Sequence, residues 1–407
     1  MTMPKYAYRA FDGLGRMETG VLEADSERAA VASFQSRGFL VTSLTTRDEK
    51  DKERPRRLGG YFRVNRKDLV VTTRQLSTMV AAGLPIISAL RILGEQVTNR
   101  RLRQVIARVR QGIERGGSLS DEIARYPEAF FPFYVNTIRA GEVSGVLDTS
   151  MNYLADYLER ELDLTQRVKT AATYPVVVGA FTTLVAVGAI AFVVPVFITI
   201  FASFKVQLPL ITILVIRTSN IVRHFWWAGI LLAVGLGMAA VVTRSSETGQ
   251  RIMDTVVLKI PIVGPLVSKL ALSRFGRAMA VLIRSGGPML EGLGVVSGAL
   301  GNRVVGDAVL AARERMQQGE SMSQSLQRNR LIPPMVAQMV RVGEESGTVD
   351  AIFDRVAEFY EREVDNTVKR FASIVEPILI VGVGGLVALV ALAVLMPIWT
   401  LIAKLPR

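Results

Sequence analysis

The sequence predicts an all-α membrane protein with two homologous cytoplasmic antiparallel helical bundles, three transmembrane helices and a small α/β module at the N-terminus. The membrane part is predicted because the 407-residue chain is 50% hydrophobic and carries long apolar runs without a charged residue. The duplication is predicted because residues 139–161 recur as residues 341–363, with ten of twenty-three positions identical. A repeat of about 200 residues indicates a duplicated domain, since solenoid repeats are about 20–50 residues long.

The N-terminal residues 1–46 are expected to form a small ββαβ module. The dipeptide Asp12-Gly13 is a turn signal between two strand-like segments. The expected elements are strands at residues 5–11, 17–24 and 39–44 and a helix at residues 27–37. Residues 47–67 are densely charged and are expected to be a solvated linker.

The two bundles are expected to span residues 68–174 and residues 244–376, with about six helices in each. Apolar residues at helical spacing support this interpretation, as in the series Leu102, Val105, Ile106, Val109 and Ile113. Ser118 with Asp121, and Ser321 with Gln324, have the spacing of a capping box at matching places in the two copies. Helices of this size joined by short connections favour an antiparallel bundle.

Three apolar runs are expected to cross the membrane, since about 20 apolar residues span the hydrocarbon core. They are residues 175–203, 225–243 and 377–403. The second run is the shortest, and a buried soluble helix is the alternative there. The loop 204–224 is expected on the periplasmic side with the tail 404–407, because Lys and Arg are concentrated beside the bundles. The N-terminus is expected in the cytoplasm, because the first 53 residues are polar and charged.

Four prolines lie at the ends of the first and third runs. Pro175 and Pro377 are expected to begin their membrane helices, because proline suits the first helical turn. Pro195 and Pro397 lie near the outer ends and are expected to kink or end the helices. A hinge that transmits motion across the membrane is the alternative role for these four residues.

The residues that catalysis needs are scarce in this chain. It has no cysteine, one histidine (His224) and no P-loop sequence, so neither an enzyme nor a cofactor is expected. No charged residue interrupts the apolar runs, which is evidence against an ion-coupled transporter. The net charge of +13 favours anionic lipids, rather than nucleic acid, as a partner.

Two glutamates, Glu142 and Glu344, occupy the same place in the repeated Gly-Glu-x-Ser-Gly sequence. Each is expected in a glycine-flanked turn between helices. The favoured role is a helix cap, since a carboxylate near a helix N-terminus gains about 0.3–1 kcal/mol and satisfies free N–H groups. Contact with a cytoplasmic partner and ligation of a hard cation are the alternatives. The candidate site residues are Gly141, Glu142, Ser144, Gly145, Gly343, Glu344, Ser346 and Gly347.

These motifs together resemble the inner-membrane platform family of type II secretion systems and type IV pilus machines. The paired Gly-Glu-x-Ser-Gly sequences, each followed by an apolar run, carry most of the resemblance. Further matching segments are Arg74-Gln75-Leu76, Ala82-Gly83-Leu84-Pro85, Ala155-Asp156-Tyr157-Leu158-Glu159, Tyr174-Pro175, Leu208-Pro209, Glu376-Pro377 and Pro397. Phe131-Pro132 departs from the Pro-Pro of the family, which the second copy keeps as Pro333-Pro334.

The resemblance implies a non-enzymatic platform at the base of a pseudopilus. Such a platform docks a cytoplasmic hexameric assembly ATPase and inner-membrane scaffold proteins, and it couples motion of the ATPase to extraction of pseudopilins from the bilayer. Homo-oligomers are expected, because the platform must meet a ring-shaped motor. A platform for a type IV pilus is the alternative function.

Overall fold

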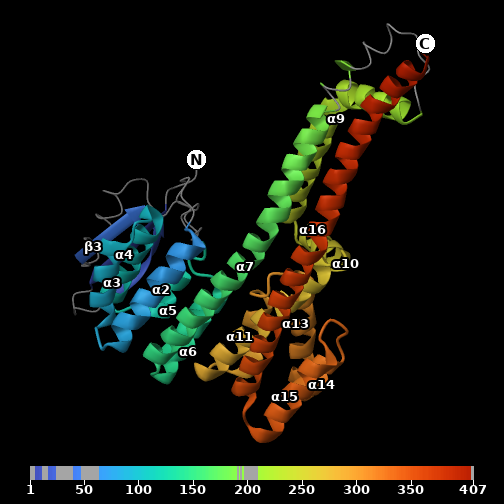
Figure 1. The fold of residues 1–407 in the computed structure, drawn as a ribbon. Helices are drawn as coiled ribbons and strands as arrows, with labels where there is room; N and C mark the ends of the chain where they lie inside the picture. Colours follow the sequence, from blue (N-terminus) through green and yellow to red (C-terminus); the bar gives the residue numbers. More distant parts are fainter. Residues whose placement is uncertain are drawn as a thin grey trace. The chain divides into compact units, whose positions relative to one another are not determined.

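The computed structural model describes residues 5–11, 17–23, 40–46, 64–189, 192, 195–196 and 210–404. The chain divides into two compact units, residues 1–62 and residues 63–407 (Figure 1). The expected helix at 27–37, most of the linker, loop residues 204–209 with Leu208-Pro209, and residues 405–407 lie outside the described residues.

The described part of the first unit is a three-stranded sheet in the order β2-β1-β3. Its strands are β1 (Lys5–Phe11), β2 (Met17–Glu23) and β3 (Leu40–Thr46). β1 pairs antiparallel with both neighbours, and the pairing with β3 shifts register between Arg9 and Ala10. The three expected strands therefore lie within two residues of their predicted bounds.

Within the described residues, each copy of the repeat contains six helices in the same order. In the first copy they are α2 (Arg66–Ala81), α3 (Ile86–Gln96), α4 (Arg100–Glu114), α5 (Leu119–Ala124), α6 (Pro132–Ser144) and α7 (Leu147–Gly188). In the second they are α11 (Val263–Arg284), α12 (Met289–Ser297), α13 (Arg303–Gln317), α14 (Met322–Gln327), α15 (Pro334–Ser346) and α16 (Val349–Lys404). The structure therefore has the duplicated helical architecture that the repeat predicts.

Local sequence explains where these helices begin. Asn99 accepts hydrogen bonds from the backbone N–H groups of Arg101 and Leu102, and Asn302 does the same in the second copy. Such side chains satisfy N–H groups that have no partner inside the helix. Pro132 stands at the start of α6, where its missing N–H costs nothing.

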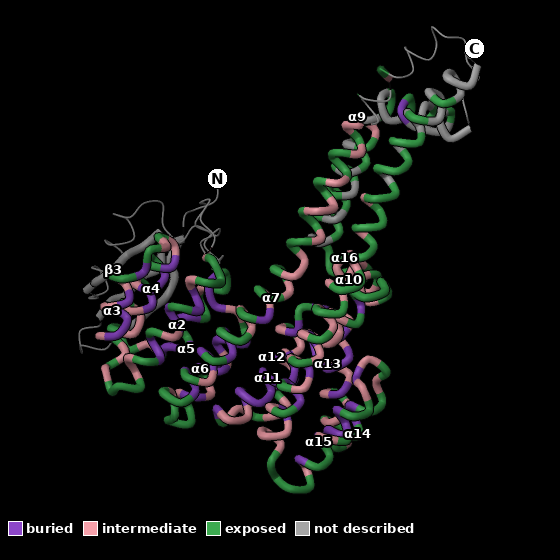
Figure 2. Tube along the Cα trace, viewed as in Figure 1, coloured by how far each residue is buried: buried purple, intermediate pink, exposed green. Residues whose placement is uncertain are grey.

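Each bundle encloses an apolar core, and the buried positions lie along its helices (Figure 2). Aromatic rings meet in both cores. In the first bundle the ring centroids of Phe133 and Tyr157 are 4.7 Å apart, and in the second those of Phe275 and Phe353 are 5.4 Å apart. The expected stripe on α4 is confirmed, since Leu102, Val105, Ile106 and Val109 are all buried. Burial of such side chains contributes about 1.5–3 kcal/mol each, so the cores stabilise both bundles.

α7 and α16 continue from the bundles into apolar sequence without a break (Figure 1). Among the described helices, these two are long and apolar enough to cross a membrane, and their most apolar windows are not buried by protein. The prediction that Pro175 and Pro377 begin separate helices is wrong, since both lie inside continuous helices. Proline inside a helix removes one hydrogen bond, which a long helix tolerates when its other bonds remain.

The prediction for the outer ends is corrected in part. α16 runs through Pro397 to Lys404, so this proline does not end the helix. Pro195 and its neighbour Val196 are helical in the described part of the chain. Their side-chain roles stay predictions.

Residues 204–224 are not wholly a loop, because α9 (Leu210–Ser245) is helical from Leu210 onward. α9 bends at Phe225, whose backbone angles are non-helical, and the predicted second span begins at this bend. His224 is exposed there, and its backbone carbonyl accepts a hydrogen bond from the Trp227 indole at 2.9 Å. The apolar composition of this stretch favours a helix over a turn, so the predicted loop was too long.

A further helix, α10 (Glu247–Lys259), precedes the second bundle and was not distinguished in the sequence. α10 and α11 together are apolar enough for a span but meet at 112°. α11 is a bundle helix, because Phe275, Ala278 and Met279 on it are buried in the protein core. α11 therefore belongs to the second bundle rather than to a membrane span.

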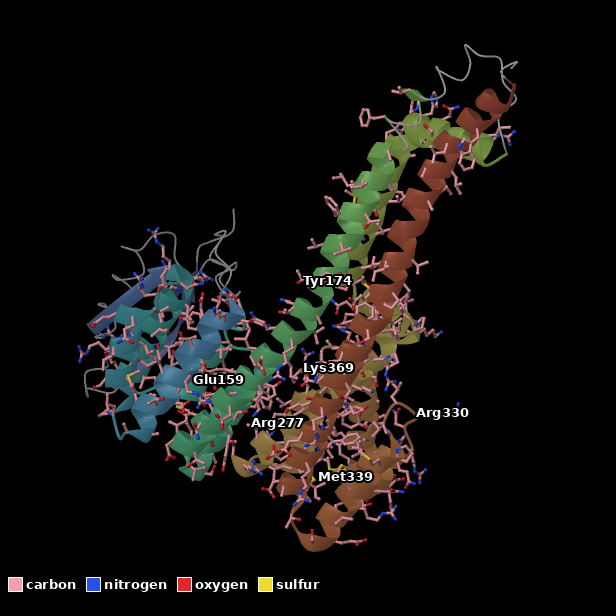
Figure 3. All side chains as sticks on the ribbon, in the orientation of Figure 1. Glu159, Tyr174, Arg277, Arg330, Met339 and Lys369 are labelled. Atoms are coloured by element: carbon pink, nitrogen blue, oxygen red, sulfur yellow. The ribbon has the colours of Figure 1, made fainter. Side chains whose placement is uncertain are left out.

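An arginine on the first helix of each copy clamps the last helix. Figure 3 labels one member of each pair, Glu159 and Arg277. Arg74 on α2 bonds both carboxylate oxygens of Glu159 on α7, at 2.7 and 2.6 Å. At the same place in the second copy, Arg277 on α11 bonds Glu361 on α16 at 2.7 Å and also bonds Asp354. Bidentate or forked arginine pairs fix geometry as well as adding energy, so the clamps orient the long helices.

The two clamps differ in exposure, and we expect their removal to differ in cost. The Arg277 side chain is 10% exposed, whereas that of Arg74 is 30% exposed. Arg277→Ala leaves two partly buried carboxylates without a partner, and we expect a loss of about 2–4 kcal/mol of unfolding free energy. For Arg74→Ala we expect about 1 kcal/mol or less.

Protection of each bundle from protease in membranes, followed against temperature, measures this difference. Arg91→Ala is the control, because its pair with Glu95 is exposed and 3.9 Å long. Equal effects of Arg277→Ala and Arg91→Ala would contradict a stabilising clamp.

The Arg74 clamp also predicts a dependence on pH. Hydrogen bonding to Arg74 holds the pKa of the Glu159 carboxyl below its ordinary value of 4.5. A lowered pKa means that the clamp stabilises the fold above about pH 4.5 and that this contribution is lost as pH falls through the folded-state value. We expect Glu159→Gln to flatten the loss of melting temperature between pH 5 and pH 3, roughly the range of carboxyl titration. An unchanged slope would remove Glu159 from the acid response.

Candidate functional site at the paired interhelical turns

The repeated Gly-Glu-x-Ser-Gly sequence ends α6 in the first copy and α15 in the second. Gly145 and Gly347 follow these helices with φ of 72° and 71°, a left-handed conformation that favours glycine. The turn closes when Val146 N–H donates to the Gly141 carbonyl at 2.9 Å. This geometry sends the chain back along the bundle and begins the long helix that follows.

The first glycine of each motif allows two helices to approach closely. A methyl group added at Gly141 would lie 2.5 Å from the Ser150 hydroxyl oxygen on α7 and 3.3 Å from the Leu147 backbone. At Gly343 it would lie 3.0 Å from Ile352 and 3.1 Å from the Val349 backbone on α16. These glycines therefore serve packing in both copies.

The glutamates are not in the turns, because Glu142 and Glu344 lie in the last turns of α6 and α15. Glu142 accepts hydrogen bonds from the backbone N–H groups of Leu119 at 2.7 Å and Ser120 at 3.0 Å. Glu344 accepts equivalent bonds at the start of α14, at 2.7 and 3.2 Å. Each carboxylate thus caps a short helix about 22 residues earlier in the chain, and neither caps the helix that follows.

A serine completes each of these caps. Ser118 accepts a hydrogen bond from the Asp121 backbone at 3.1 Å, and Ser321 accepts one from the Gln324 backbone at 3.3 Å. The serine half of each predicted capping box is confirmed. With the glutamates, the serines satisfy three N–H groups at the start of each short helix.

The serines of the two turns have different surroundings. The Ser144 hydroxyl donates to the backbone carbonyl of Ala140 and lies 3.1 Å from the carbonyl of Ser285, at the end of α11 in the other bundle. The Ser346 hydroxyl bonds within its own turn, to Val342 at 2.7 Å and Thr348 at 2.7 Å. The first turn therefore contacts the other bundle through Ser144. An apolar side chain is also exposed in or next to each motif, Val143 at 85% and Val342 at 57%.

The described residues hold little that could perform chemistry. They include no cluster of three or more His, Asp or Glu side chains placed to hold a metal ion. A cavity of about 20 Å³ in the first bundle is lined by apolar side chains such as Leu76, Leu93 and Ile106. That volume suits about one water molecule, so it is a packing gap rather than a ligand site.

Sequence reasoning missed the contact between Ser144 and Ser285 and the two arginine clamps. The repeat contains a signal for the clamps, because Arg74 and Arg277 are related by the same shift of 203 residues that relates Gly83 to Gly286. The contact between the bundles has no such signal, because its acceptor is a backbone carbonyl.

The family described as "Type II secretion system (T2SS), protein F" matches residues 72–195 and again residues 275–397, and its N-terminal domain matches residues 3–45. A type IV pilus assembly protein PilC of Thermus thermophilus is 36% identical over 411 residues, which cover 99% of each chain. A PilC of Myxococcus xanthus is 33% identical over 98% of this chain and 95% of its own. A type II secretion system protein F of Vibrio cholerae is 32% identical over 97% of this chain and 98% of its own.

Proposed function

Because this chain belongs to the type II secretion system protein F family, in which secretion and pilus assembly proteins are related, we propose that it is a non-enzymatic inner-membrane platform. It docks a cytoplasmic hexameric ATPase and inner-membrane scaffold proteins. It couples the motion of the ATPase to the assembly of a fibre from pseudopilins, by which folded proteins are exported across the outer membrane.

The observation that carries this proposal is the direct continuation of each bundle into an apolar helix. α7 has 42 residues and α16 has 56, so at about 1.5 Å per residue they extend roughly 63 and 84 Å. A rotation or shift applied to a bundle is transmitted along such a helix, since no flexible joint intervenes. The arginine clamps hold each long helix to the first helix of its bundle and support this coupling.

Three membrane spans fit the proposal, at residues 175–203, 225–243 and 377–403. The middle span lies in α9 beyond the bend at Phe225, where Leu231, Leu232, Val234 and Val241 are exposed apolar residues. This arrangement places the N-terminal module, with its α/β fold, and both bundles in the cytoplasm and the C-terminus in the periplasm. Basic residues beside the spans then face anionic lipid headgroups.

A platform for type IV pilus assembly is the second candidate function. The observation that favours it is the 36% identity with the Thermus thermophilus PilC, against 32% with the Vibrio cholerae secretion protein. The difference is small, and both functions use the same bundle-and-helix architecture.

A deletion strain tests both functions, with the location of secreted enzymes and the presence of surface pili scored together. Secretion by a pseudopilus is expected to fail, with enzymes held in the periplasm and pili intact. Lost pili with normal secretion would assign the protein to the pilus machine. If both survive in a strain without a second homologue, the platform function is overturned, and restoration by the wild-type gene is the control for either loss.

A further inference from the structure

We propose that copies of this chain associate head to tail, with the exposed end of α15 and side of α16 in one copy packed on the outer side of α2 in the next. The contact repeats, between chains, the packing that joins the two bundles within one chain. It goes beyond the proposed function, because it follows from the internal repeat and is independent of which machine the protein serves. It also gives partner contact, the alternative role of the motif at residues 343–347, one occupant, a second copy of this chain.

Within the chain, α6 and α7 of the first bundle cover one side of α11 in the second. Ser144 lies 3.1 Å from the Ser285 carbonyl, and Glu161 pairs with Arg274 at 3.4 Å. Further along the long helices, α7 and α16 are joined by two pairs: Arg160 with Glu361 at 3.8 Å and Arg167 with Asp365 at 2.9 Å. Ser285 is fully buried.

The repeat supplies a counterpart for most of these residues. Ser346 is the counterpart of Ser144, and Ala82 is the counterpart of Ser285. Because the acceptor at Ser285 is its backbone carbonyl, alanine at position 82 offers the same acceptor. Gly83 also keeps the left-handed backbone of Gly286, with φ of 82° against 80°.

The charged pairs of the long helices are preserved as well. Lys369 and Asp163 are the counterparts of Arg167 and Asp365, so opposite charges again face one another across the proposed contact. Arg362 and Glu159 likewise replace Arg160 and Glu361. Charge complementarity of this kind orients a contact more than it strengthens it.

On α2, the counterparts of covered α11 residues are exposed. On α11 the covered stripe contains Arg274, Ala278, Val281 and Ser285, of which the last three are buried. The matching stripe on α2 is wholly exposed and consists of Val71, Gln75, Thr78 and Ala82. These positions share one face of the helix by their spacing. Ser346, Arg362 and Lys369 on the opposing surface are exposed, as are Ser144, Arg160 and Arg167 in the contact within the chain, so these side chains lie at the rim of the contact.

Two contacts within the chain have no counterpart. Val71 is the counterpart of Arg274, which pairs with Glu161 within the chain. Ala81 is the counterpart of Arg284, whose guanidinium lies 5.8 Å from the centre of the Tyr153 ring. The contact between chains is therefore weaker than the contact within one chain. A contact between two different surfaces builds a ring or an open chain rather than a closed symmetric pair.

Cysteine cross-linking of the full-length chain in membranes tests this arrangement, since the sequence has no native cysteine. Ala82→Cys and Ser346→Cys are made in separate, differently tagged chains and co-expressed. Because a disulfide needs Cα atoms within about 7 Å, oxidation is expected to link the two chains when they meet head to tail. When either variant is expressed alone, the yield of disulfide-linked chains is expected to be several-fold lower. The Ser144→Cys/Ser285→Cys double variant is the positive control, since these neighbouring positions are expected to form a disulfide within one chain.

Charge reversal supplies a second measurement. Lys369→Glu places a carboxylate opposite Asp163 and is expected to lower the yield of the mixed disulfide about two- to fivefold, the range of an exposed ion pair. Lys259→Glu makes the same change on an exposed residue outside both surfaces and is expected to leave the yield unchanged.

Three outcomes would overturn the proposal. One is no mixed disulfide while the positive control oxidises fully. Another is a disulfide between two Ser346→Cys chains that forms in the same yield as the mixed disulfide, which indicates a symmetric contact. The third is protection of Ala82→Cys from a polar maleimide in the detergent-solubilised monomer, which indicates that residues 1–62 of the same chain cover α2.

Discussion

Replacing Gly276 by valine is expected to disrupt the second bundle more than any other single change considered above. At this position α11 crosses α16 with backbone against backbone. An added methyl group would lie 2.8 Å from the Phe353 carbonyl oxygen and 2.8 Å from the Ala357 nitrogen. Backbone atoms cannot move aside as a flexible side chain can, so the two helices must separate. Overpacking of this kind costs about 1–3 kcal/mol and more where nothing can yield, and we expect about 3 kcal/mol or more here.

Gly94 provides the matched control, since it is also a helical glycine and no atom lies within 4 Å of an added methyl group there. Gly94→Ala is expected to be neutral or to stabilise α3 by up to about 1 kcal/mol. Protease digestion of membranes reports both changes, because an opened second bundle is cut between α11 and α16. A Gly276→Val protein as resistant as the Gly94→Ala protein would show that the crossing can widen without cost.

The duplicated helical fold could be predicted from sequence because its signals are local or repeated. The stripe on α4 follows from residues three and four apart, and the serine caps follow from residues three apart. The two copies reinforce one another, because a weak signal such as Ser118 gains support from Ser321. The continuity of α7 could not be predicted in this way, since a proline at position 175 is compatible with either a helix start or a helix interior.

The sequence predicts the capping role of the candidate site residues, but not which helices they cap. A capping role for Glu142 and Glu344 was favoured from their charge and neighbours, and each does bind helix N–H groups. The helix that each one caps lies about 22 residues earlier, and only tertiary packing brings the two together. Spacing along the chain carries no information about this tertiary contact, so the sequence alone does not identify the helix that each glutamate caps.

Replacing both Glu142 and Glu344 by lysine is expected to abolish function while leaving insertion into the membrane intact. Each substitution removes two hydrogen bonds to backbone N–H groups and places a cation at the positive end of a helix. Hydrogen bonds to a charged group contribute about 1.5–3 kcal/mol each before the cost of the unfavourable dipole is added. We expect roughly 2–4 kcal/mol lost from each bundle, since part of each site is open to water.

Glu95→Lys is the control, because it makes the same charge change at an exposed glutamate of α3, outside both caps and both proposed contact surfaces. If the carboxylates act only as caps, loss of function should follow loss of bundle stability, and Glu142→Gln with Glu344→Gln should retain much of both, since the amide oxygen still accepts a bond. If they contact a partner through their charge, the glutamine variants should remain folded and protease-resistant yet fail in secretion or piliation. The structure favours the first result, because both oxygens of each carboxylate are already occupied by backbone N–H groups of the same bundle.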